Sequence, residues 1–438
     1  MSTYFTELLQ EILHQAQKKG ASDAAGFINH DSGFSVNVRM QEVETVAFNE
    51  DKNISLVVYF GKRQGSASST DLSAASIEQV VEAACSIAAV SSMDPCFGLP
   101  DAELMTTTHQ DLNLYHPWDI EPTAMIEQAI SCEKHAMALD TRITNSDGVS
   151  GSTNSFLHCY ANTNGGAGAI RGTSHGFSCS LIANNGSNMQ RDYDYTTARN
   201  SVNLTPRIKL AESAVNKTIS RLGARKLKTC KTPVLFSSRV SSGLIASFIN
   251  AISGSNLYRK NSFLVDSFGK LIFPTWMQIY ERPRLLSALG SAPFDSEGVP
   301  TRDNIFVDKG CITQYVLGSY SARKLGLTST ANSDGVHNLH VTPNAGGLDE
   351  LIKIMHTGLL VTELMGQGIN ILTGDYSRGA FGFWIENGSI QYPVEGITVA
   401  GNLKEMYSEI SAVGNDINPN IATRCGSILI SNMTIAGC

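Results

Sequence analysis

The chain has 438 residues, of which 42% are hydrophobic and 17% are charged, with 38 glycines and a formal net charge of -7. This composition argues against a disordered chain, and the many glycines favour a β-rich protein with tight turns over a helical bundle. The length predicts two or three domains. The negative charge argues against a nucleic-acid partner, which requires a basic surface.

The first residues predict an amphipathic helix rather than an export signal. Apolar residues recur at helical spacing from Phe5 to Ala16, and Gly20 can end the helix. Glu7 and Glu11 interrupt any apolar core of a signal peptide. No apolar run approaches the roughly 18 residues that a membrane span needs. The nine cysteines include no CxxC pair, which predicts reduced, mostly buried thiols in a cytoplasmic protein.

The N-terminal half mixes strands with helices. Alternation within residues 33–60 predicts strands, and GFSVNVRM places Phe34, Val36, Val38 and Met40 on one face. Further elements follow in chain order: a helix at 73–90, a linker near 94–121, a helix at 122–139, strands in FLHCYANT and HGFSCSLIA, and a helix at 207–222.

From Pro233 onward, short strands and turns dominate the pattern. The predicted elements are a strand in PVLFS, a helix at 238–252, a hairpin around Asp308–Gly310, a hairpin around Asn387–Gly388, a helix in LKEMYSEISAV ending at Gly414, and a last strand in GSILISNMTIAG.

The whole pattern predicts an α+β protein, with a mixed α/β N-terminal half and a β-rich C-terminal domain. We predict an N-terminal α/β domain at 1–110 and a central α/β region packed with it at 120–228. The C-terminal β-rich domain is predicted at 233–438, after the basic stretch RLGARKLKTCKTP.

The stretch TGDYSRGAFGFWIENG places Ser377 between glycines and raises the question of a hydrolase nucleophile. A nucleophile elbow requires G-x-S-x-G at a strand-to-helix turn. Here Gly374 lies one residue too early, and a hairpin follows. We therefore interpret the stretch as a loop in which Asp375 and Arg378 pair with each other or bind the backbone of a ligand.

A second candidate nucleophile lies in SARK at 321–324, which fits the pattern S-x-x-K. In such a pair Lys324 could deprotonate Ser321. The usual companion motifs are missing, since residues 332–334 hold Asn, Ser and Asp in the wrong order and no K-T-G occurs. A serine amidase using Ser321 and Lys324 is therefore kept only as an alternative.

No motif predicts a metal or phosphate site. His337 and His340 are three residues apart in VHNLH, but no third ligand is close in sequence, so we expect structural histidines. DYDY at 192–195 lacks the glycine and distal glutamate of a calcium loop. NGGAGAIRG at 164–172 lacks the G-K-[ST] of a phosphate loop. The residues by themselves therefore predict no catalytic set.

Several longer stretches resemble one known family, in the right order and over nearly the whole chain. They are QEVETVAFNEDKNISLVVYFGKRQGSASSTDLS (41–73), YRKNSFL (258–264), PFDSEGVPT (293–301), SYSARKLGLTSTAN (319–332), GLLVTELMGQGINILTGDYSRGAFGFWIENGSIQYPVEGITVAGNL (358–403) and VGNDI (413–417). These stretches resemble the TldD/PmbA peptidase family, and the match is closest to its PmbA, or TldE, branch.

This resemblance implies a role in proteolysis. In the family, a TldD subunit carries His-Glu-x-x-x-His on a helix, binds zinc and pairs with a PmbA subunit to degrade or trim unfolded peptides, including peptide precursors. The family also carries an older label as a modulator of DNA gyrase, which the negative charge does not favour. The resemblance therefore implies a heterodimer with a TldD-like subunit, with a homodimer possible for the chain alone.

The chain departs from the TldD branch at the zinc motif. The corresponding helix reads ASFINAI at 246–252 and contains neither histidine nor glutamate, so it offers zinc no lone pair from an imidazole or carboxylate. In the family, the TldD branch also uses a cysteine in the loop before its last strand, whereas Cys425 of this chain lies close to the strand rather than in that loop. We therefore expect no metal and no catalytic residue in this chain, with zinc bound by the partner, and leave open whether the chain is itself a hydrolase.

The resemblance turns attention to the loop around Ser377 as a surface that shapes a cleft or a partner interface. The candidate residues are Gly366, Gly368, Asn370, Gly374, Asp375, Tyr376 and Arg378. Glycines allow close backbone approach, and a strand edge beside them could pair with an extended peptide. The alternative is that they only stabilise turns. A stand-alone peptide-binding or regulatory protein remains the alternative function.

Overall fold

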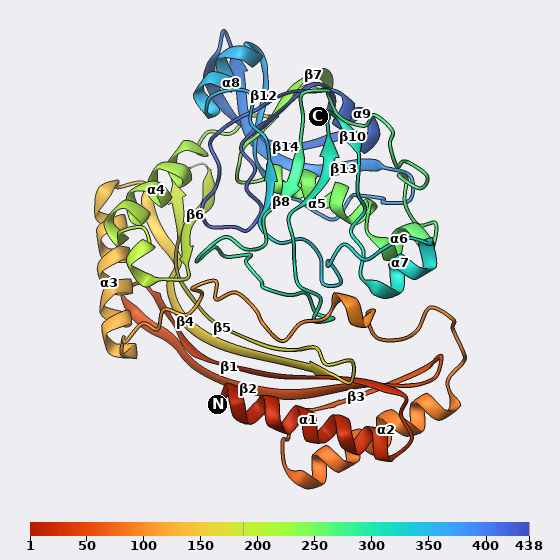
Figure 1. Cartoon of the computed structure of the whole chain (residues 1–438). Helices are drawn as coiled ribbons and strands as arrows, with labels where there is room; N and C mark the ends of the chain where they lie inside the picture. The colour runs from red at the N-terminus through yellow and green to blue at the C-terminus, as the bar shows by residue number, and fades with distance from the viewer. Residues whose placement is uncertain (187, 438) are drawn as a thin grey trace.

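The computed structural model describes residues 1–186 and 188–437, and it confirms the predicted α+β class. An N-terminal unit is built on one long, curved sheet, and a C-terminal unit is rich in short strands. Figure 1 shows the C-terminal unit lying over one face of that sheet, while helices cover the opposite face and one end.

The N-terminal sheet has six strands in the order β3-β2-β1-β4-β5-β6, and all neighbours are antiparallel. Their bounds are β1 Asp23–Arg39, β2 Glu42–Phe60, β3 Arg63–Ser69, β4 Ile143–Asn162, β5 Ala167–Asn184 and β6 Met189–Ala198. Because β1 pairs with β4, residues of the predicted N-terminal and central regions share one continuous sheet.

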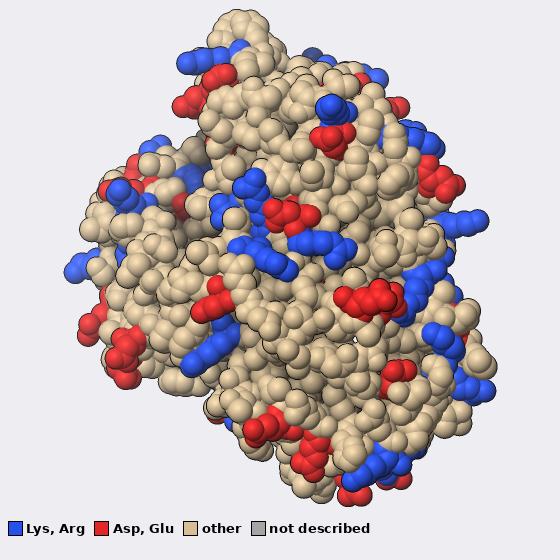
Figure 2. Space-filling view, in the orientation of Figure 1, with Lys and Arg blue, Asp and Glu red and all other residues tan. Residues whose placement is uncertain are grey.

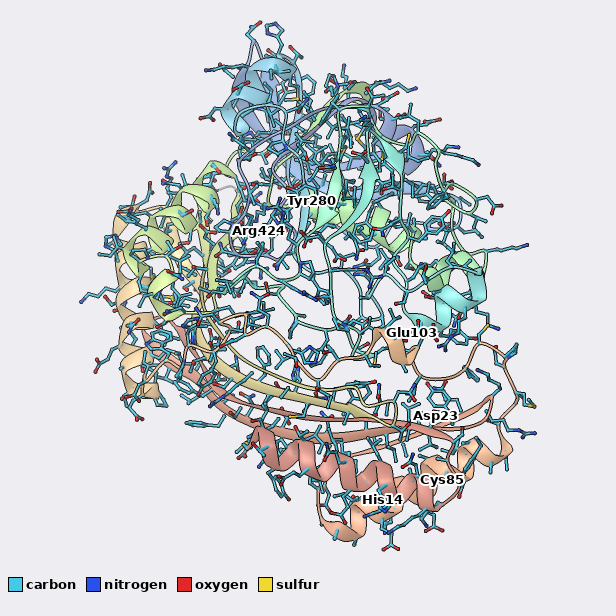
Figure 3. The ribbon with its side chains drawn as sticks, viewed as in Figure 1. His14, Asp23, Cys85, Glu103, Tyr280 and Arg424 are labelled. Carbon is cyan, nitrogen blue, oxygen red and sulfur yellow. The ribbon has the colours of Figure 1, made fainter. Side chains whose placement is uncertain are left out.

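Two pairs of helices cover the outer face of this sheet. Helices α1 (Ser2–Lys18) and α2 (Ala74–Val90) pack on Ile28 and its neighbours, and α3 (Pro122–Leu139) and α4 (Arg207–Ser220) pack around Val36. Residues an even number apart on a strand face the same way, so both pairs bury one face. His14 on α1 and Cys85 on α2 lie on the side away from the C-terminal unit (Figure 3). Among the described residues, no helix has the length and apolar composition to cross a membrane.

The C-terminal unit contains a six-stranded sheet in the order β14-β13-β12-β7-β16-β15, and an additional pairing of β14 with β16 closes it on itself. Its strands are β7 Cys230–Phe236, β12 Gly358–Met365, β13 Asp375–Glu386, β14 Ser389–Asn402, β15 Ile410–Val413 and β16 Ile428–Ala436. A four-stranded sheet, β10-β9-β8-β11, lies beside it, with β8 Ile279–Glu281, β9 Asn304–Asp308, β10 Cys311–Ile312 and β11 Leu339–Val341.

One large apolar core holds the C-terminal unit together. Helix α5 (Ser241–Ala251) contributes Phe248, whose ring meets those of Phe273 and Tyr407 at centroid distances of 4.9 and 6.0 Å. Aromatic pairs at such distances add to the stability gained from area burial. The shorter helices around this core are α6 Gly254–Tyr258, α7 Ser319–Leu325, α8 Leu348–Met355 and α9 Leu403–Ser408.

Both predicted hairpins are present, and the turn chemistry explains them. Lys309 and Gly310 connect β9 to β10, and Asn387 and Gly388 connect β13 to β14, all with positive φ. Two-residue turns of this kind match the twist of the strands that they join.

Two predictions about element boundaries were wrong. Met40 does not continue the inward face of its strand, because Met40 and Gln41 form the β1–β2 turn with φ of 51° and 65°. The helix predicted up to Gly414 ends at Ser408, and Ile410–Val413 forms β15. Ile410 pairs with Ile430 of β16, so burial of β-branched residues against a strand outweighs the local helical pattern.

The segment predicted as a linker near 94–121 packs between the sheet and the C-terminal unit. Its regular structure is a single short turn, η1 (Ala102–Leu104), and Figure 3 shows Glu103 of this turn lying between the two units. Arg323 of α7 donates to Leu99 O at 2.6 Å, and Lys324 forms an ion pair with Asp94 at 2.7 Å. The segment therefore ties the two units together.

Candidate functional site

A cavity of about 550 Å³ lies where the inner face of the N-terminal sheet meets loops of the C-terminal unit, and we call it the interdomain cleft. The sheet contributes Phe27, Asn29, Asp31, Asn53, Phe156, His158, Tyr160 and Ile170, and the C-terminal unit contributes residues 289–292 and 294–296 with Asp334 and His337. Arg199, just after β6, completes the charged lining.

Strand alternation explains why polar and aromatic residues meet on the floor of the cleft. Phe27, Asn29 and Asp31 are spaced by two along β1, so all three face the C-terminal unit. Antiparallel pairing places Tyr160 opposite Phe27 and His158 opposite Asn29 on β4. The sheet thus presents one apolar and one polar row to the same cavity.

Aromatic rings form the apolar wall. The ring centroids of Phe27 and Tyr160 are 4.9 Å apart, and Phe294 approaches Tyr160 at 6.4 Å from the C-terminal side. Gly298 is required here for two reasons, because its φ is +77° and a Cβ would lie 2.1 Å from the Tyr160 ring. The close approach of this loop to β4 therefore holds the wall in place.

Asp295 is the most buried carboxyl group in the lining, with 1% exposure. One carboxylate oxygen accepts from the backbone N–H groups of Glu297 and Val299 at 3.0 Å, and the other accepts from Ser333 N at 3.1 Å. Burial, followed by repulsion from Glu297, raises the Asp295 pKa to about 6 despite these hydrogen bonds. Asp295 therefore carries a charge that changes in a mildly acidic pH range.

A second buried acid supports the segment that bears His337. Glu281 of β8 is 1% exposed and accepts from Asn304, Asn332 and the backbone N–H of His337 at 2.7 to 2.8 Å. Burial raises the Glu281 pKa, and the hydrogen bonds oppose that shift. This network fixes the backbone of His337 at the wall of the cleft.

His337 is 9% exposed as a residue, and its Nε2 atom is buried with no hydrogen-bond partner among the described residues. The nearest carboxylate oxygen belongs to Asp334, 3.5 Å away. Burial lowers the His337 pKa, but Asp334, Glu281 and Asp295 together outweigh it, so the net pKa is raised. The imidazole therefore pairs with Asp334 in the wall of the cleft.

The guanidinium of Arg199, which lines the cleft, is already bound by backbone carbonyl oxygens. Arg199 donates to the carbonyl oxygens of Thr173 at 3.0 Å and Leu289 at 2.6 Å, and its guanidinium lies 5.1 Å from the Phe156 ring centroid. These contacts join the sheet to the loop that roofs the cleft. Arg199 therefore has a structural role between the units, and the aspartates of the cleft are not paired with it.

The loop predicted as a site lies elsewhere, from the end of β12 into the start of β13. Its residues do not line the interdomain cleft, nor a second cavity of about 410 Å³ that lies between β6 and residues 237–239. The structure gives the candidates different exposures: exposed for Gly366, Gly368, Asn370 and Asp375, buried for Gly374 and Tyr376, and intermediate for Arg378. The loop folds tightly onto β13, since Ser377 N donates to Gly368 O at 2.7 Å and Asn370 N donates to Asp375 O at 2.9 Å.

The side chains of this loop do not form the expected Asp–Arg contact. The Asp375 carboxylate accepts from Thr373 at 2.7 Å, whereas Arg378 donates to Leu364 O at 3.5 Å. Burial raises the Tyr376 pKa to about 12, and its ring meets Phe236 edge-on. Ser377 lies within β13 rather than at a strand-to-helix turn, so the structure does not support a nucleophile elbow.

The geometry around SARK does not support a serine amidase either. Ser321 donates to Gly318 O at 3.1 Å, while the Lys324 ammonium contacts Asp94 at 2.7 Å. The hydrogen bond to Asp94 raises the Lys324 pKa, so Lys324 stays protonated and is less available to accept a proton from Ser321. The two histidines also separate, because His340 stacks on Tyr280 with centroids 5.1 Å apart, in the part of the C-terminal unit that Figure 3 marks with Tyr280 and Arg424.

The side chains of α5, the helix for which the resemblance raised the question of zinc, do not fit a zinc ion. Helix α5 buries Leu244, Ile245 and Phe248 in the core. Cys425 is fully buried, and burial raises its pKa to about 12, whereas zinc binds thiolate. Within residues 1–186 and 188–437, no three His, Cys, Asp or Glu side chains group so that they could hold a metal ion.

The chain matches three domain models of one family. Domain 1 of the PmbA/TldA metallopeptidases matches residues 24–88, the central domain 115–222 and the C-terminal domain 229–437. "Metalloprotease PmbA" of Escherichia coli O157:H7 is 45% identical over 434 residues, covering 98% of this chain and 96% of the relative. The chain therefore belongs to the PmbA/TldD family.

Further comparisons agree on the branch and the fold. The "Metalloprotease PmbA homolog" of Haemophilus influenzae is 45% identical, with 96% of this chain and 94% of the relative covered, whereas the TldD homolog of that organism is 22% identical over 47% of this chain and 45% of the relative. The chain therefore falls on the PmbA branch.

Two solved structures share the fold over nearly the whole chain. A gyrase-modulator candidate from Bacteroides thetaiotaomicron superimposes with a TM-score of 0.93 at 27% identity, covering 99% of this chain and 98% of the other. TldE from Thermococcus kodakarensis superimposes with a TM-score of 0.85 at 21% identity, covering 98% and 99%.

The residues of the interdomain cleft are those that the sequence did not single out for function. Asp295 occurs in the family stretch PFDSEGVPT, and His337 occurs in VHNLH, but neither stretch has the spacing of a known catalytic motif. The sequence signal that could have indicated the cleft was the abundance of Asp, Asn and Gly in these loop segments. Its partners on β1 and β4 are more than a hundred residues away in sequence, so spacing could not reveal the cleft.

Proposed function

We propose that this chain is the subunit without zinc in a TldD–PmbA type metallopeptidase, which degrades or trims unfolded peptides in the bacterial cytoplasm. A TldD-like partner supplies the zinc and the catalytic helix. This chain contributes walls of the substrate chamber and stabilises the active heterodimer.

One observation carries this proposal. At the position where the TldD branch has His-Glu-x-x-x-His, helix α5 offers apolar side chains such as Phe248, and the nearby Cys425 stays protonated through burial. Zinc peptidases need imidazole and carboxylate ligands with one open position for water. A chain with this helix supports hydrolysis only by assisting a partner that has those ligands.

The occurrence of both branches in one organism is consistent with such a partnership. Haemophilus influenzae has a PmbA homolog and a TldD homolog, and both match this chain. On the surface shown in Figure 2, acidic and basic side chains are interspersed without a broad basic field, which favours a protein partner over nucleic acid.

The first test is to tag the chain in its own organism, purify it gently and identify what co-elutes. We expect a stoichiometric partner bearing His-Glu-x-x-x-His, and peptide hydrolysis that is lost when a chelator removes zinc from the complex. Hydrolysis by a preparation proven free of the partner, and abolished by a chelator, would overturn the proposal.

The loop between β12 and β13 is proposed as part of the partner or substrate surface. Arg378→Ala removes its guanidinium without a change in the backbone, and we expect weaker partner binding or slower peptide degradation. If both stay at wild-type level, Gly366, Gly368 and the neighbouring residues serve only the turns of the C-terminal unit.

A second candidate function is a stand-alone peptide-binding or regulatory protein. The interdomain cleft favours it, because a cavity of about 550 Å³ with aromatic walls can hold a small ligand or a peptide end without a partner. Purification of the chain alone, carrying unaltered peptide detected by mass spectrometry, would support this function over the heterodimer.

A further inference from the structure

We propose that the interdomain cleft of this chain binds a primary ammonium group next to an apolar side chain, as found at the amino terminus of a peptide. This proposal takes the peptide as ligand from the proposed function, but it concerns a binding site within this chain alone. It is argued from the cavity, the charges and the aromatic walls of the cleft.

The charge balance of the lining favours a cation. Asp31, Asp295 and Asp334 all line the cleft, on both the sheet side and the C-terminal side. The guanidinium of Arg199 is held by the carbonyl oxygens of Thr173 and Leu289 rather than by these aspartates. Two histidine rings do contact them: His158 lies 3.5 Å from Asp31, and His337 lies 3.5 Å from Asp334. An ammonium group entering the cavity therefore meets carboxylates from two directions, and charge-assisted hydrogen bonds to it are stronger than neutral ones.

The aromatic wall sets the chemistry of the group next to the charge. The ring centroid of Tyr160 lies 4.9 Å from that of Phe27 and 6.4 Å from that of Phe294. Rings in such an arrangement offer apolar surface for a side chain, and their faces attract a nearby cation. A small hydrated metal ion or a polyanion would not use this wall.

His337 is not available to a ligand as a donor. Its Nε2 atom is buried and lies 3.5 Å from Asp334 Oδ1, so the ring pairs with that carboxylate. An ammonium group on this side of the cleft shares Asp334 with His337.

Two sources can supply this ligand chemistry, the amino terminus of a peptide and the side chain of lysine. The test uses three short peptide amides: Phe-Ala-Ala-Ala with a free amino terminus, the same peptide acetylated, and an acetylated peptide with one lysine. Binding to the purified chain is measured by isothermal titration calorimetry. We expect the first to bind at least about tenfold more tightly than the acetylated peptide, because acetylation removes the charged hydrogen-bond donor.

Two aspartate variants test whether the peptide binds in the interdomain cleft. Asp31→Asn and Asp334→Asn alter half-exposed carboxylates, with side-chain exposures of 43% and 39%, so both proteins should fold. Each is expected to weaken binding about two- to fivefold, as for a partly exposed ion pair. Asp119→Asn is the matched control, because Asp119 is exposed and does not line the cleft.

The outcomes separate cleanly. Tighter binding of the lysine peptide than of the free-terminus peptide would assign the cleft to a lysine side chain and overturn the choice of an amino terminus. Equal binding of the acetylated and free peptides, no binding at millimolar concentration, or unchanged binding by both cleft variants would overturn the ammonium site. None of these results bears on co-purification with a zinc subunit, so failure of this site is distinguishable from failure of the proposed function.

Discussion

At the scale of single residues, Asp295 links burial in the cleft to the pH dependence of stability. Its pKa rises from 3.8 to about 6 on folding. An acid with a raised folded pKa binds its proton more tightly in the folded state, so its contribution is complete below about pH 4 and is lost as the pH rises through about 6. The shift corresponds to about 3 kcal/mol in the free energy of unfolding.

Asp295→Asn should remove this part of the pH dependence. Urea unfolding of both proteins between pH 4 and pH 7 measures it, and the expected result is a shallower loss of stability with rising pH in the variant. The level of stability also falls because Ser333 N loses an acceptor, so the slope is the readout. Parallel curves would show that this carboxyl group does not titrate near pH 6.

At the scale of elements, the connection between β12 and β13 tests whether glycines are needed for space or for conformation. A Cβ on Gly368 would lie 1.7 Å from Ser377 O, whereas a Cβ on Gly366 meets no atom within 4 Å although its φ is +77°. Gly368→Ala should lower the free energy of unfolding by about 1–3 kcal/mol through overpacking. Gly366→Ala should cost about 1 kcal/mol through backbone strain alone.

The pair is compared by urea denaturation under one set of conditions. Equal losses would mean that the loop moves away from Ser377 without cost, and the steric explanation would be wrong. Partner binding measured on the same two variants then separates the stability of this loop from any role at an interface.

At the scale of the whole molecule, ion pairs between acidic and basic side chains connect the N-terminal and C-terminal units and hold them in their relative position. Asp192 of β6 is 6% exposed and contacts Arg221 at 3.2 Å and Arg239 of the C-terminal unit at 2.7 Å. Arg221 also contacts Glu363 of β12 at 2.6 Å. Removal of one partner from a buried group of charges leaves an uncompensated charge behind.

We expect Asp192→Asn to lower the free energy of unfolding by about 3 kcal/mol or more, measured by urea or thermal unfolding. The control is Asp147→Asn, which breaks an exposed ion pair with Arg191 on the same sheet and should cost less than about 1 kcal/mol. Similar losses for both variants would show that the buried cluster does not hold the units together.

The sequence by itself determined the features that depend on neighbours along the chain. Helical spacing predicted α1, α2 and α3, because the apolar stripe of an amphipathic helix is formed by residues only three or four positions apart in the sequence. Turn chemistry at Asn387–Gly388 predicted the β13–β14 hairpin. The composition of residues 246–252, which contain neither histidine nor glutamate, led to the prediction that this helix binds no zinc. The longer stretches that resemble the TldD/PmbA family led to the expectation of a peptidase system.

Only the tertiary structure decided which distant residues share a cavity and which groups lose contact with water. The pairing of β1 with β4 puts His158 opposite Asn29 and within 3.5 Å of Asp31. Packing of the C-terminal unit on the sheet adds Asp295 and His337. Long-range strand pairing depends on burial that no short window contains. Burial also explains why Ile410–Val413 forms a strand instead of the predicted end of a helix. Burial raises the pKa of Asp295 as well. The cleft and the charge state of its side chains therefore depend on the folded chain and could not be predicted from the sequence.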